Sequence, residues 1–245
     1  MEITSIHNPK VKAWAKLKEK KYRDQTQMFL VAGEHLIQEA QKAGCLSELL
    51  VCKGIDPVID GVTTYEVTKE ILRKLTSLTS SENSIGVCRM PQHTFAQWER
   101  IIVLDGVQDP GNMGTIIRNA IAFNYQAVIL STDCVDIYNE KVIRATQGAL
   151  FHLPILRCDL TKQLPQLKQA GITLYATALR QSVSLQSIRE VHRHALIFGN
   201  EGSGIKAEIM ALADHCIKIE MAAFESLNVA VASGICMYYF YQLQF

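Results

Sequence analysis

The sequence predicts a two-part α/β protein, with a small N-terminal module followed by a larger domain built on a parallel β-sheet. Short apolar runs alternate with helix-length segments along the chain, a pattern typical of parallel strands covered by helices. Residues 90–99 contain a proline and lose the strand pattern, which places a boundary near Pro91. With 245 residues, 48% of them hydrophobic, each part can bury a core of its own.

Composition excludes several protein classes. A charged fraction of 20%, 14 glycines and 6 prolines do not fit a collagen, a coiled coil or a disordered chain. No apolar run approaches the roughly 18 residues of a membrane span, and no signal segment is visible, so we expect a cytoplasmic protein. Seven cysteines without C-x-x-C spacing predict reduced thiols and no metal site.

The N-terminal segment is more basic than the chain as a whole. The net charge of the chain is only +1, which argues against a surface that grips nucleic acid everywhere. The first 27 residues, however, carry seven basic and three acidic side chains, a net charge of +4. Asn8 and Pro9 resemble a helix start, and Val11, Trp14 and Leu17 follow at helical spacing. This basic helix either is simply solvated or contacts RNA. Its candidate contacts are Lys16, Lys20 and Lys21.

The remaining elements follow from periodicity. In the N-terminal module the pattern predicts strands at 28–32, 46–52 and 85–90 and helices at 34–42 and 69–75. Beyond the linker, it predicts strands at 101–104, 127–130, 172–175, 196–198 and 216–219.

The first polar segment, LDGVQDPGNMGTIIRNA, follows the predicted strand 101–104. Asn112 is the predicted N-cap of a helix that carries Arg118, and the free amides of such a helix start can hold a phosphate. Six residues separate the two, which places them on different helix faces, but a long arginine side chain can reach the same cleft. Taken alone, an asparagine-capped turn is structural in most proteins.

The second segment, LIFGNEGSGI, places three glycines after the predicted strand 196–198. Their spacing is neither the dinucleotide G-x-G-x-x-G nor a P-loop, which disfavours an NAD-linked oxidoreductase. The segment is either a tight strand-to-helix loop or a place where backbone approaches a ligand. Glu201 within it follows the carboxyl end of a strand, where open α/β sheets bind ligands.

The third segment, ESLNVAVASGICMYYF, introduces an apolar helix over residues 229–240. Ser226 is its predicted N-cap, and Asn228 is the other polar side chain at its start. By itself, a cap followed by a buried helix needs no further function.

Together and in this order, the three segments resemble the signature motifs of the SpoU, or TrmH, family of RNA ribose 2′-O-methyltransferases over about Ile101 to Phe240. The segments FLVAGEHLIQEA and SIGVCRM look like the small RNA-binding domain that precedes many such enzymes. The resemblance implies an RNA substrate-binding domain at 1–91 and a SPOUT-type catalytic domain at 92–245. In such a domain the C-terminal segment is threaded through a loop as a trefoil knot, a rare arrangement.

The resemblance also implies a cofactor and a site. S-adenosylmethionine would be held mainly by backbone groups, at positions matching Thr177, Gly199, Ile219, Met221 and Leu227. The family's polar active-site positions match Asn112, Arg118, Glu201, Ser226 and Asn228. Enzymes of this kind need no metal and usually work as homodimers that pack through the C-terminal helix.

The chain departs from the family pattern in two regions. Where the family usually has Ile-Pro-Met and then glycine, this chain has Ile219-Glu220-Met221-Ala222-Ala223, and the loop to Glu225 looks one residue shorter. In the N-terminal module, Ala32-Gly33 and Ile85-Gly86 replace the common Glu-Gly and Gln-Gly.

The expected function is S-adenosylmethionine-dependent methylation of a ribose 2′-hydroxyl in structured RNA. The extra N-terminal domain favours ribosomal RNA over transfer RNA. The alternatives are a tRNA ribose methyltransferase and, because of the altered loop at Glu220, a non-catalytic RNA-binding or ribosome-assembly factor on the same fold. The family proposal makes Arg118 the base, but a guanidinium is a poor base, so we assign it to orienting the ribose and neutralising charge on its oxygen.

Overall fold

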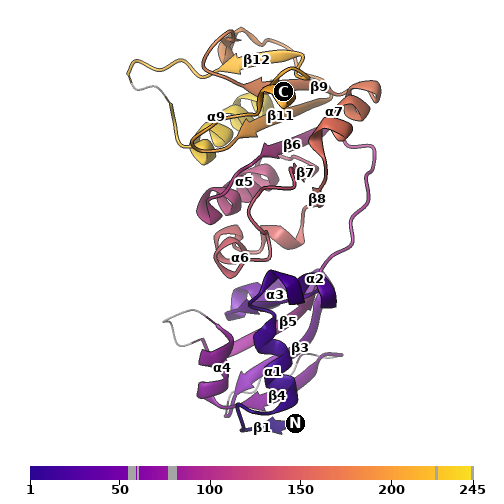
Figure 1. The fold of residues 1–245 in the computed structure, drawn as a ribbon, viewed down its shortest axis with the longest axis vertical. Helices are drawn as coiled ribbons and strands as arrows, with labels where there is room; N and C mark the ends of the chain where they lie inside the picture. Colours follow the sequence, from indigo (N-terminus) through magenta and orange to yellow (C-terminus); the bar gives the residue numbers. More distant parts are fainter. Residues whose placement is uncertain (55–58, 60, 77–81, 224–225, 244–245) are drawn as a thin grey trace. The chain divides into compact units, whose positions relative to one another are not determined.

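The structure is a computed structural model that describes residues 1–54, 59, 61–76, 82–223 and 226–243. The chain forms two compact units (Figure 1). Unit 1 contains Met1–Gln92 and Asp136–His152, and unit 2 contains His93–Val135 and Leu153–Phe245. Each unit has its own sheet and its own core.

Unit 1 is built on a five-stranded mixed sheet. The strand order is β1 (Glu2–Ile3), β4 (Thr63–Val67), β3 (Leu46–Cys52), β5 (Ser84–Arg89) and β2 (Met28–Ala32). The first three strands are mutually parallel, and β5 runs antiparallel to both of its neighbours.

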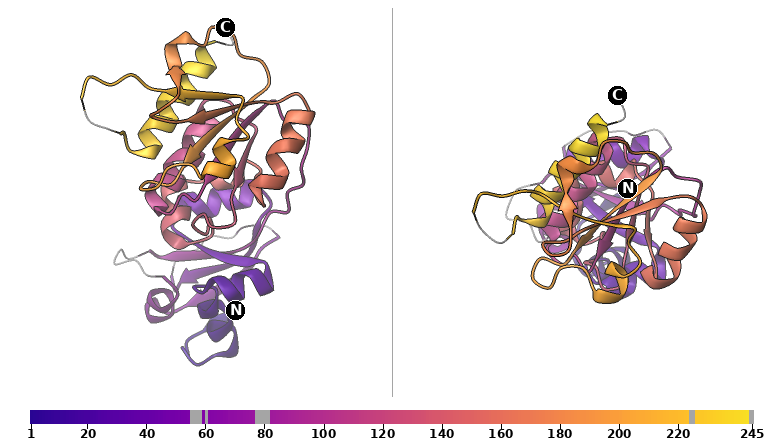
Figure 2. Two further views of the ribbon diagram at one scale, coloured as in Figure 1. Left: turned by 45° about the horizontal axis from the view of Figure 1, so that its top comes forward. Right: turned by 90° about the horizontal axis from the view of Figure 1, so that it is seen from above.

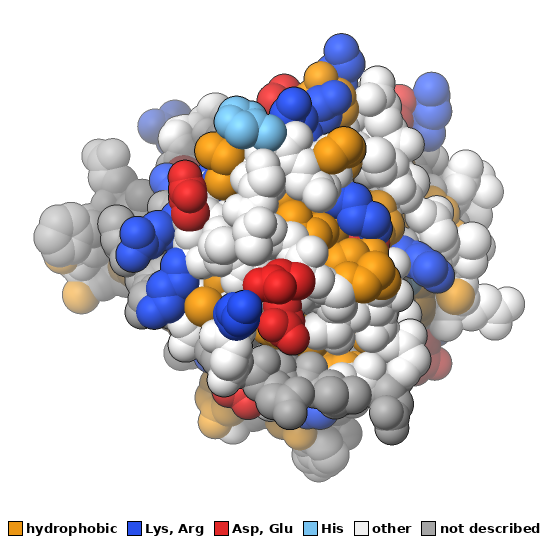
Figure 3. Space-filling view, turned by 90° about the horizontal axis from the view of Figure 1, so that it is seen from below, with side chains coloured by type: hydrophobic (Ala, Val, Ile, Leu, Met, Phe, Trp, Pro, Cys, Tyr) orange, Lys and Arg blue, Asp and Glu red, His pale blue; other side chains and the backbone are white. Residues whose placement is uncertain are grey.

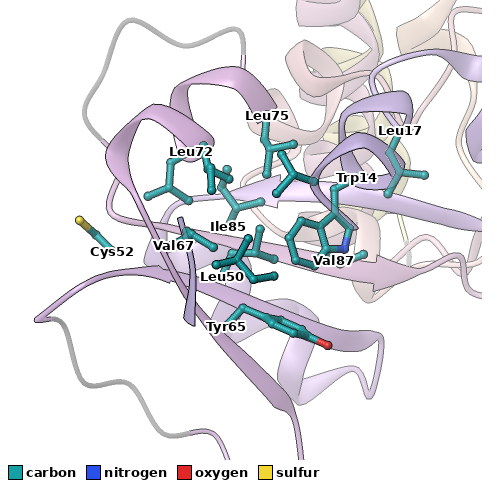
Figure 4. Packing of buried hydrophobic residues seen from close by; sticks show 13 residues of the cluster. Trp14, Leu17, Leu50, Cys52, Tyr65, Val67, Leu72, Leu75, Ile85 and Val87 are labelled. Atoms are coloured by element: carbon teal, nitrogen blue, oxygen red, sulfur yellow. The ribbon is translucent and has the colours of Figure 1, made fainter. Parts of the chain in front are cut away.

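Helices cover both faces of this sheet. On one face, α1 (Pro9–Lys16) and α4 (Lys69–Leu75) enclose the core that Figure 4 shows, with Trp14 next to Leu17 and Val87. On the other face lies α3 (Glu34–Lys42), so closely that a Cβ at Gly86 would meet Ile37 of this helix at 3.3 Å. Two more helices, α2 (Lys20–Thr26) and α6 (Glu140–Thr146), and the 3₁₀ turn η1 (Ala149–Phe151) complete the unit.

The predicted start of the first helix is confirmed. Asn8 is the N-cap of α1, its side chain accepts the Lys10 N–H at 2.8 Å, and Pro9 occupies the first turn. The helix ends at Lys16, and the basic segment continues in the separate helix α2. Glu48 on β3 fixes α1 to the sheet by accepting hydrogen bonds from Trp14 Nε1 at 2.7 Å and Lys10 Nζ at 2.9 Å.

Unit 2 contains the predicted parallel sheet, with seven strands. Their order is β10 (Val183–Ser184), β12 (His215–Lys218), β9 (Thr173–Thr177), β11 (His194–Gly199), β6 (Arg100–Asp105), β7 (Ala127–Leu130) and β8 (Ile155–Arg157). Every neighbouring pair in it is parallel.

The sheet of unit 2 is buried between two layers of helices (Figure 2). Alternate side chains such as Ile101 and Val103 pack in one core with α7 (Leu160–Gln169) and α8 (Ala207–Met210). The opposite face is covered by α5 (Pro110–Ala122) and α9 (Val229–Gln242), which pack against each other. Because both faces are buried, the central strands β6, β7 and β11 carry continuous apolar runs rather than an alternating pattern.

The strand order has a topological switch point between β6 and β11. The chain winds from β6 to β7 and β8 on one side, and β11, β9 and β12 lie on the other. The last residues of β6 and β11, Asp105 and Gly199, are paired across this switch point. Crevices outside the carboxyl ends of strands at such a point are where open α/β sheets bind ligands.

The loop of residues 178–182 spans strand β12. Thr177 at the end of β9 and Val183 at the start of β10 both pair with Ile217 of β12, from opposite sides. The connection between them therefore passes across β12 at the level of Ile217. Its first residue is fixed there, because the Ala178 N–H donates to the Ile217 carbonyl at 2.9 Å.

Two predicted helix caps are wrong. The N-cap of α5 is Asp109, whose carboxylate accepts the Asn112 N–H at 2.8 Å, so the helix starts at Pro110 and Asn112 lies in its first turn. The N-cap of α9 is Asn228 rather than Ser226.

Within the described ranges, the structure holds no helix long and apolar enough to cross a membrane.

Candidate active site

A cavity of about 780 Å³ opens at the carboxyl edge of the unit 2 sheet. This volume lies within the range of about 300–1,000 Å³ that small-molecule sites occupy. Segments after β9, β11 and β12 and the start of α9 line it. The lining includes all five residues predicted to bind the cofactor and three of those predicted to act in catalysis: Thr177, Gly199, Ile219, Met221, Leu227, Glu201, Ser226 and Asn228.

A close approach between two backbone segments requires glycine at position 199. The chain turns back on itself after β11, and Asn200 and Gly204 exchange two backbone hydrogen bonds of 3.0 Å. A Cβ on Gly199 would lie 2.2 Å from the carbonyl carbon of Gly204 and from the nitrogen of Ile205. Any side chain here would therefore displace the loop that forms one wall of the cavity.

Asn200, which the sequence analysis did not select, holds this loop. Its Oδ1 accepts the N–H groups of Gly202 at 2.9 Å and Ser203 at 3.0 Å. Its Nδ2 donates to the carbonyl of Gly106, after β6, at 2.8 Å. An asparagine between two glycines at a strand end was the available signal, because such side chains bond to nearby backbone.

Glu201 is surrounded by donors from the segment that leads into α5. It accepts hydrogen bonds from the N–H of Gln108 at 3.2 Å, the N–H of Asp109 at 3.0 Å and Nδ2 of Asn112 at 3.0 Å. Partial burial by itself would raise the pKa of this carboxyl, but the hydrogen bonds from Asn112 and from these backbone amides outweigh it and lower the pKa. Glu201 is thus held as a carboxylate.

Asn112 joins Glu201 to the start of α9. Its Oδ1 accepts a hydrogen bond from Nδ2 of Asn228 at 2.9 Å. Asn228 in turn caps α9 by accepting the N–H groups of Ala230 at 2.9 Å and Val231 at 3.3 Å. Three segments far apart in the sequence are therefore connected by one line of hydrogen bonds beside the cavity.

The other two predicted catalytic residues stand apart from this network. Ser226 lines the cavity, and across the described residues its side chain has no hydrogen-bond partner. Arg118 projects from the exposed face of α5, and its guanidinium makes neither a hydrogen bond nor an ion pair with the described part of the chain. Its charge is available to a ligand.

An ion-pair cluster that the sequence analysis missed anchors the end of the glycine loop. The Lys206 ammonium lies 3.2 Å from Oδ1 of buried Asp105 and 2.8 Å from Oδ2 of Asp133, and the Lys206 N–H donates to Asp105 Oδ2 at 2.8 Å. The hydrogen bond to Lys206 lowers the pKa of Asp133, and the bond to Asp133 raises the pKa of Lys206. The loop is thus fixed at both ends.

The altered position Glu220 forms an ion pair with Lys218, with Oε1 and Nζ 3.4 Å apart. Its neighbours Ile219 and Met221 line the cavity. The expected shortening of the loop up to Glu225 falls on residues outside the described ranges.

A group of His, Cys, Asp and Glu side chains that could hold a metal ion is not found in the portion that the structure describes.

The three predicted RNA-contacting lysines lie in unit 1, whereas the cavity residues belong to unit 2. Lys20 forms an ion pair with Asp24, whereas the ammonium groups of Lys16 and Lys21 lie 5.1 Å and 6.0 Å from the ring centre of Tyr22. Figure 3 looks at one face of unit 1, on which Lys and Arg side chains are spread out rather than gathered in a continuous patch.

Comparison with protein families gives two matches. Residues 99–238 match the SpoU rRNA Methylase family, and residues 8–86 match the MRM3-like substrate binding domain. The chain is 37% identical over 243 residues to the 23S rRNA (guanosine(2553)-2′-O)-methyltransferase RlmP of Bacillus subtilis, which covers 97% of this chain and 98% of that protein. It is 33% identical over 253 residues to an uncharacterized tRNA/rRNA methyltransferase of Synechocystis, covering 96% and 92% of the two chains.

Solved structures agree with this result. The structure resembles an AdoMet-bound rRNA methyltransferase from Sinorhizobium meliloti with a TM-score of 0.89 and 29% sequence identity, covering 99% of this chain and 97% of that one. These likenesses confirm the predicted fold class and the predicted family.

Proposed function

The chain belongs to the SpoU rRNA Methylase family, and on that premise we propose that it transfers a methyl group from S-adenosylmethionine to a ribose 2′-hydroxyl of ribosomal RNA. The observation that carries this proposal is the line of hydrogen bonds from Glu201 through Asn112 to Asn228, beside a cavity large enough for the cofactor. The rRNA-directed names of similar proteins favour ribosomal over transfer RNA.

The residues present fit the cofactor. The cavity combines apolar side chains, among them Phe198, Ile217 and Leu227, with backbone groups of the glycine loop, as expected for an adenosine-bearing ligand. The absence of a side chain at Gly199 lets the loop fold back on itself, so that backbone forms this wall of the cavity. When bound, S-adenosylmethionine supplies a methyl group on a sulfonium, which an oxygen nucleophile can attack in line.

The chain's own residues orient the ribose and neutralise charge on its oxygen. The Glu201–Asn112–Asn228 line fixes the first turn of α5 against the start of α9, which holds the acceptor side of the cavity in one geometry. We assign to Arg118 the orientation of the ribose and the stabilisation of negative charge on its 2′-oxygen, because its guanidinium is charged and has no partner among the residues that the structure describes. Ser226, whose hydroxyl at the cavity has no hydrogen-bond partner within the described ranges, is assigned to substrate positioning.

An Arg118→Ala variant tests this assignment. We expect methylation of RNA to be lost, while S-adenosylhomocysteine still binds in calorimetry, because Arg118 is not among the residues lining the cavity. Arg189→Ala, which removes another exposed guanidinium of unit 2, is the matched control and should keep full turnover. Retained turnover in Arg118→Ala would refute the role.

Residues 1–91 are proposed to bind the RNA substrate, and residues 92–245 to carry the chemistry. The match of residues 8–86 to a substrate binding domain supports this division, as does the +4 charge of the leading segment. Replacing Lys16, Lys20 and Lys21 by Glu should weaken RNA binding and flatten its salt dependence. Lys162→Glu on α7 is the control, and unchanged RNA affinity in the triple variant would mean that the basic helices are merely solvated.

A homodimer is proposed through the exposed face of α9. Val231, Ile235 and Tyr238 are 52%, 38% and 50% exposed and recur at the spacing of one helix face, and Ile121 on α5 is also exposed. Arg118 lies one turn before Ile121, so a partner on this face would border the candidate active site.

Two further parts of the proposal concern the knot and the location. The crossing of β12 by loop 178–182 supports a threaded knot at this strand. The protein is proposed to act in the cytoplasm.

The identity of the RNA needs its own experiment. Ribose-methylation mapping of ribosomal and transfer RNA from a strain that lacks the protein should reveal one missing 2′-O-methyl group in ribosomal RNA. A missing group in transfer RNA would instead support the tRNA enzyme, and an intact methylation pattern in both would support an assembly factor.

A further inference from the structure

We propose that Arg180 binds the carboxylate at the methionine end of S-adenosylmethionine. This inference rests on the proposed function and adds a charged side-chain contact to the backbone and apolar groups that are proposed to hold the cofactor. Arg180 lines the cavity and lies at the middle of loop 178–182, the segment that crosses β12. Ile217, with which the residues at both ends of this loop pair, lines the same cavity.

The charges of the cavity single out Arg180. Three charged side chains line it in the described ranges: Arg180, Glu201 and Lys218. Glu201 is occupied by the donors of the α5 start, and Lys218 pairs with Glu220. Arg180 is exposed and forms no ion pair or hydrogen bond with any described residue. It is the lining charge that remains available to an anion.

The loop that carries Arg180 is held in an uncommon conformation. Gln181 has a φ of 51°, in the left-handed region that non-glycine residues rarely adopt, and the buried Oγ of Ser182 finds no hydrogen-bond partner among the described residues. The ends of the loop are fixed to β12, by the Ala178 N–H and by the pairing of Val183. Such conformations persist where the surroundings impose them, and they are concentrated at ligand-binding positions.

The position of Arg180 in the sheet favours the cofactor over RNA as the source of the anion. Arg118, which is proposed to orient the ribose, lies on the helix that follows β6, whereas Arg180 follows β9, and β11 lies between the two strands. At about 4.8 Å between neighbouring strands, the ends of β6 and β9 lie roughly 10 Å apart along the sheet edge. S-adenosylmethionine has one anionic group, a carboxylate, and the planar fork of a guanidinium matches a carboxylate in two parallel hydrogen bonds.

Two ligands that differ in this one group test the proposal. S-adenosylhomocysteine has the amino-acid end, and 5′-methylthioadenosine lacks it. Calorimetry should show that Arg180→Ala weakens S-adenosylhomocysteine binding by about tenfold or more and leaves 5′-methylthioadenosine binding unchanged. Arg180→Lys should fall between, because it keeps the charge and loses the fork. Arg189→Ala, an exposed arginine away from the cavity, should match the wild type for both ligands.

The other outcomes overturn the inference in distinguishable ways. Equal losses for both ligands would show that Arg180 only supports the loop. Unchanged binding of S-adenosylhomocysteine together with weaker RNA binding would assign Arg180 to an RNA phosphate. If the wild-type protein bound neither ligand, the proposed function itself would fail, whereas wild-type binding that Arg180→Ala does not alter would refute only the role of Arg180.

Discussion

Replacing Glu201 by glutamine tests whether the hydrogen-bonded line beside the cavity is built around a carboxylate. Oε1 of Glu201 accepts from the Asp109 N–H and Asn112 Nδ2, both at 3.0 Å, and Oε2 accepts from the Gln108 N–H at 3.2 Å and from Asn200 Nδ2 at 3.4 Å. A glutamine amide has one oxygen and one NH₂, so in either orientation two of these four donors would face another donor. Hydrogen bonds to charged groups contribute about 1.5–3 kcal/mol each, which exposure at this site reduces, so Glu201→Gln should cost about 1–3 kcal/mol in total.

The pH dependence makes the prediction specific. The folded-state pKa of Glu201 lies below the ordinary value of 4.5, so its stabilisation is complete above the unfolded-state pKa and is lost as the pH falls through the depressed folded-state pKa. The difference between wild type and Glu201→Gln should therefore be full at neutral pH and shrink below pH 4.5. In that acidic range the protonated carboxyl, like the amide, has one oxygen that only accepts.

Urea unfolding provides the measurement. Trp98 packs against the core of unit 2, and a Trp14→Phe background removes the signal of unit 1. Glu190→Gln, at an exposed acid of the same unit, is the control and should not change the midpoint. A Glu201→Gln variant as stable as wild type at neutral pH, or a difference that acid does not narrow, would refute the reasoning.

Three further predictions concern the same unit. Gly199→Ala should weaken S-adenosylhomocysteine binding by at least about tenfold, because its Cβ would meet backbone at 2.2 Å, whereas Gly202→Ala, with 3.6 Å of space, should bind normally in the same titration. Lys206→Met should destabilise unit 2 by about 1–3 kcal/mol in urea, because the buried Asp105 carboxylate loses its cation, and Lys206→Arg should cost less. Ile235→Glu should shift a dimer to monomers in sedimentation, and an unchanged mass would exclude this face as the interface.

Elements with strong periodicity could be predicted from the sequence to the residue. The bounds of β2, α3, β3, α4 and β7 agree with the prediction, and β5 is shifted by one residue. Strands β1 and β10, of two residues each, and β8, of three, were missed because they carry too few residues to establish a period. Strand β4 and helix α6 were missed as well, although they are as long as the predicted β2 and α4. Strand β10, of two residues, exists because β12 supplies its hydrogen-bond partners, which no local pattern records.

The candidate site divides in the same way. The second and third segments contain residues that line the cavity, because each follows a strand whose carboxyl end lies at one edge of the sheet. Asn112 and Arg118 of the first segment do not line it. They did not identify the Lys206 cluster, since Lys206 and its partner Asp105 are 101 residues apart and look like ordinary surface charges in the sequence. The contact depends on the pairing of β6 with β11, which is a property of the fold.

The two mistaken caps explain how the polar residues become available for function. Asn112 was predicted to cap α5, a role that would have turned its side chain onto its own helix. Because Asp109 takes that role one turn earlier, the amide of Asn112 is free to join Glu201 to Asn228. Likewise, Asn228 caps α9 in place of Ser226, which leaves the hydroxyl of Ser226 at the cavity without a backbone partner in the described chain. Asp109 and Asn228 thus take the capping roles expected of Asn112 and Ser226, which leaves the Asn112 amide for the hydrogen-bonded line and the Ser226 hydroxyl at the cavity. Local capping rules alone cannot distinguish the two arrangements.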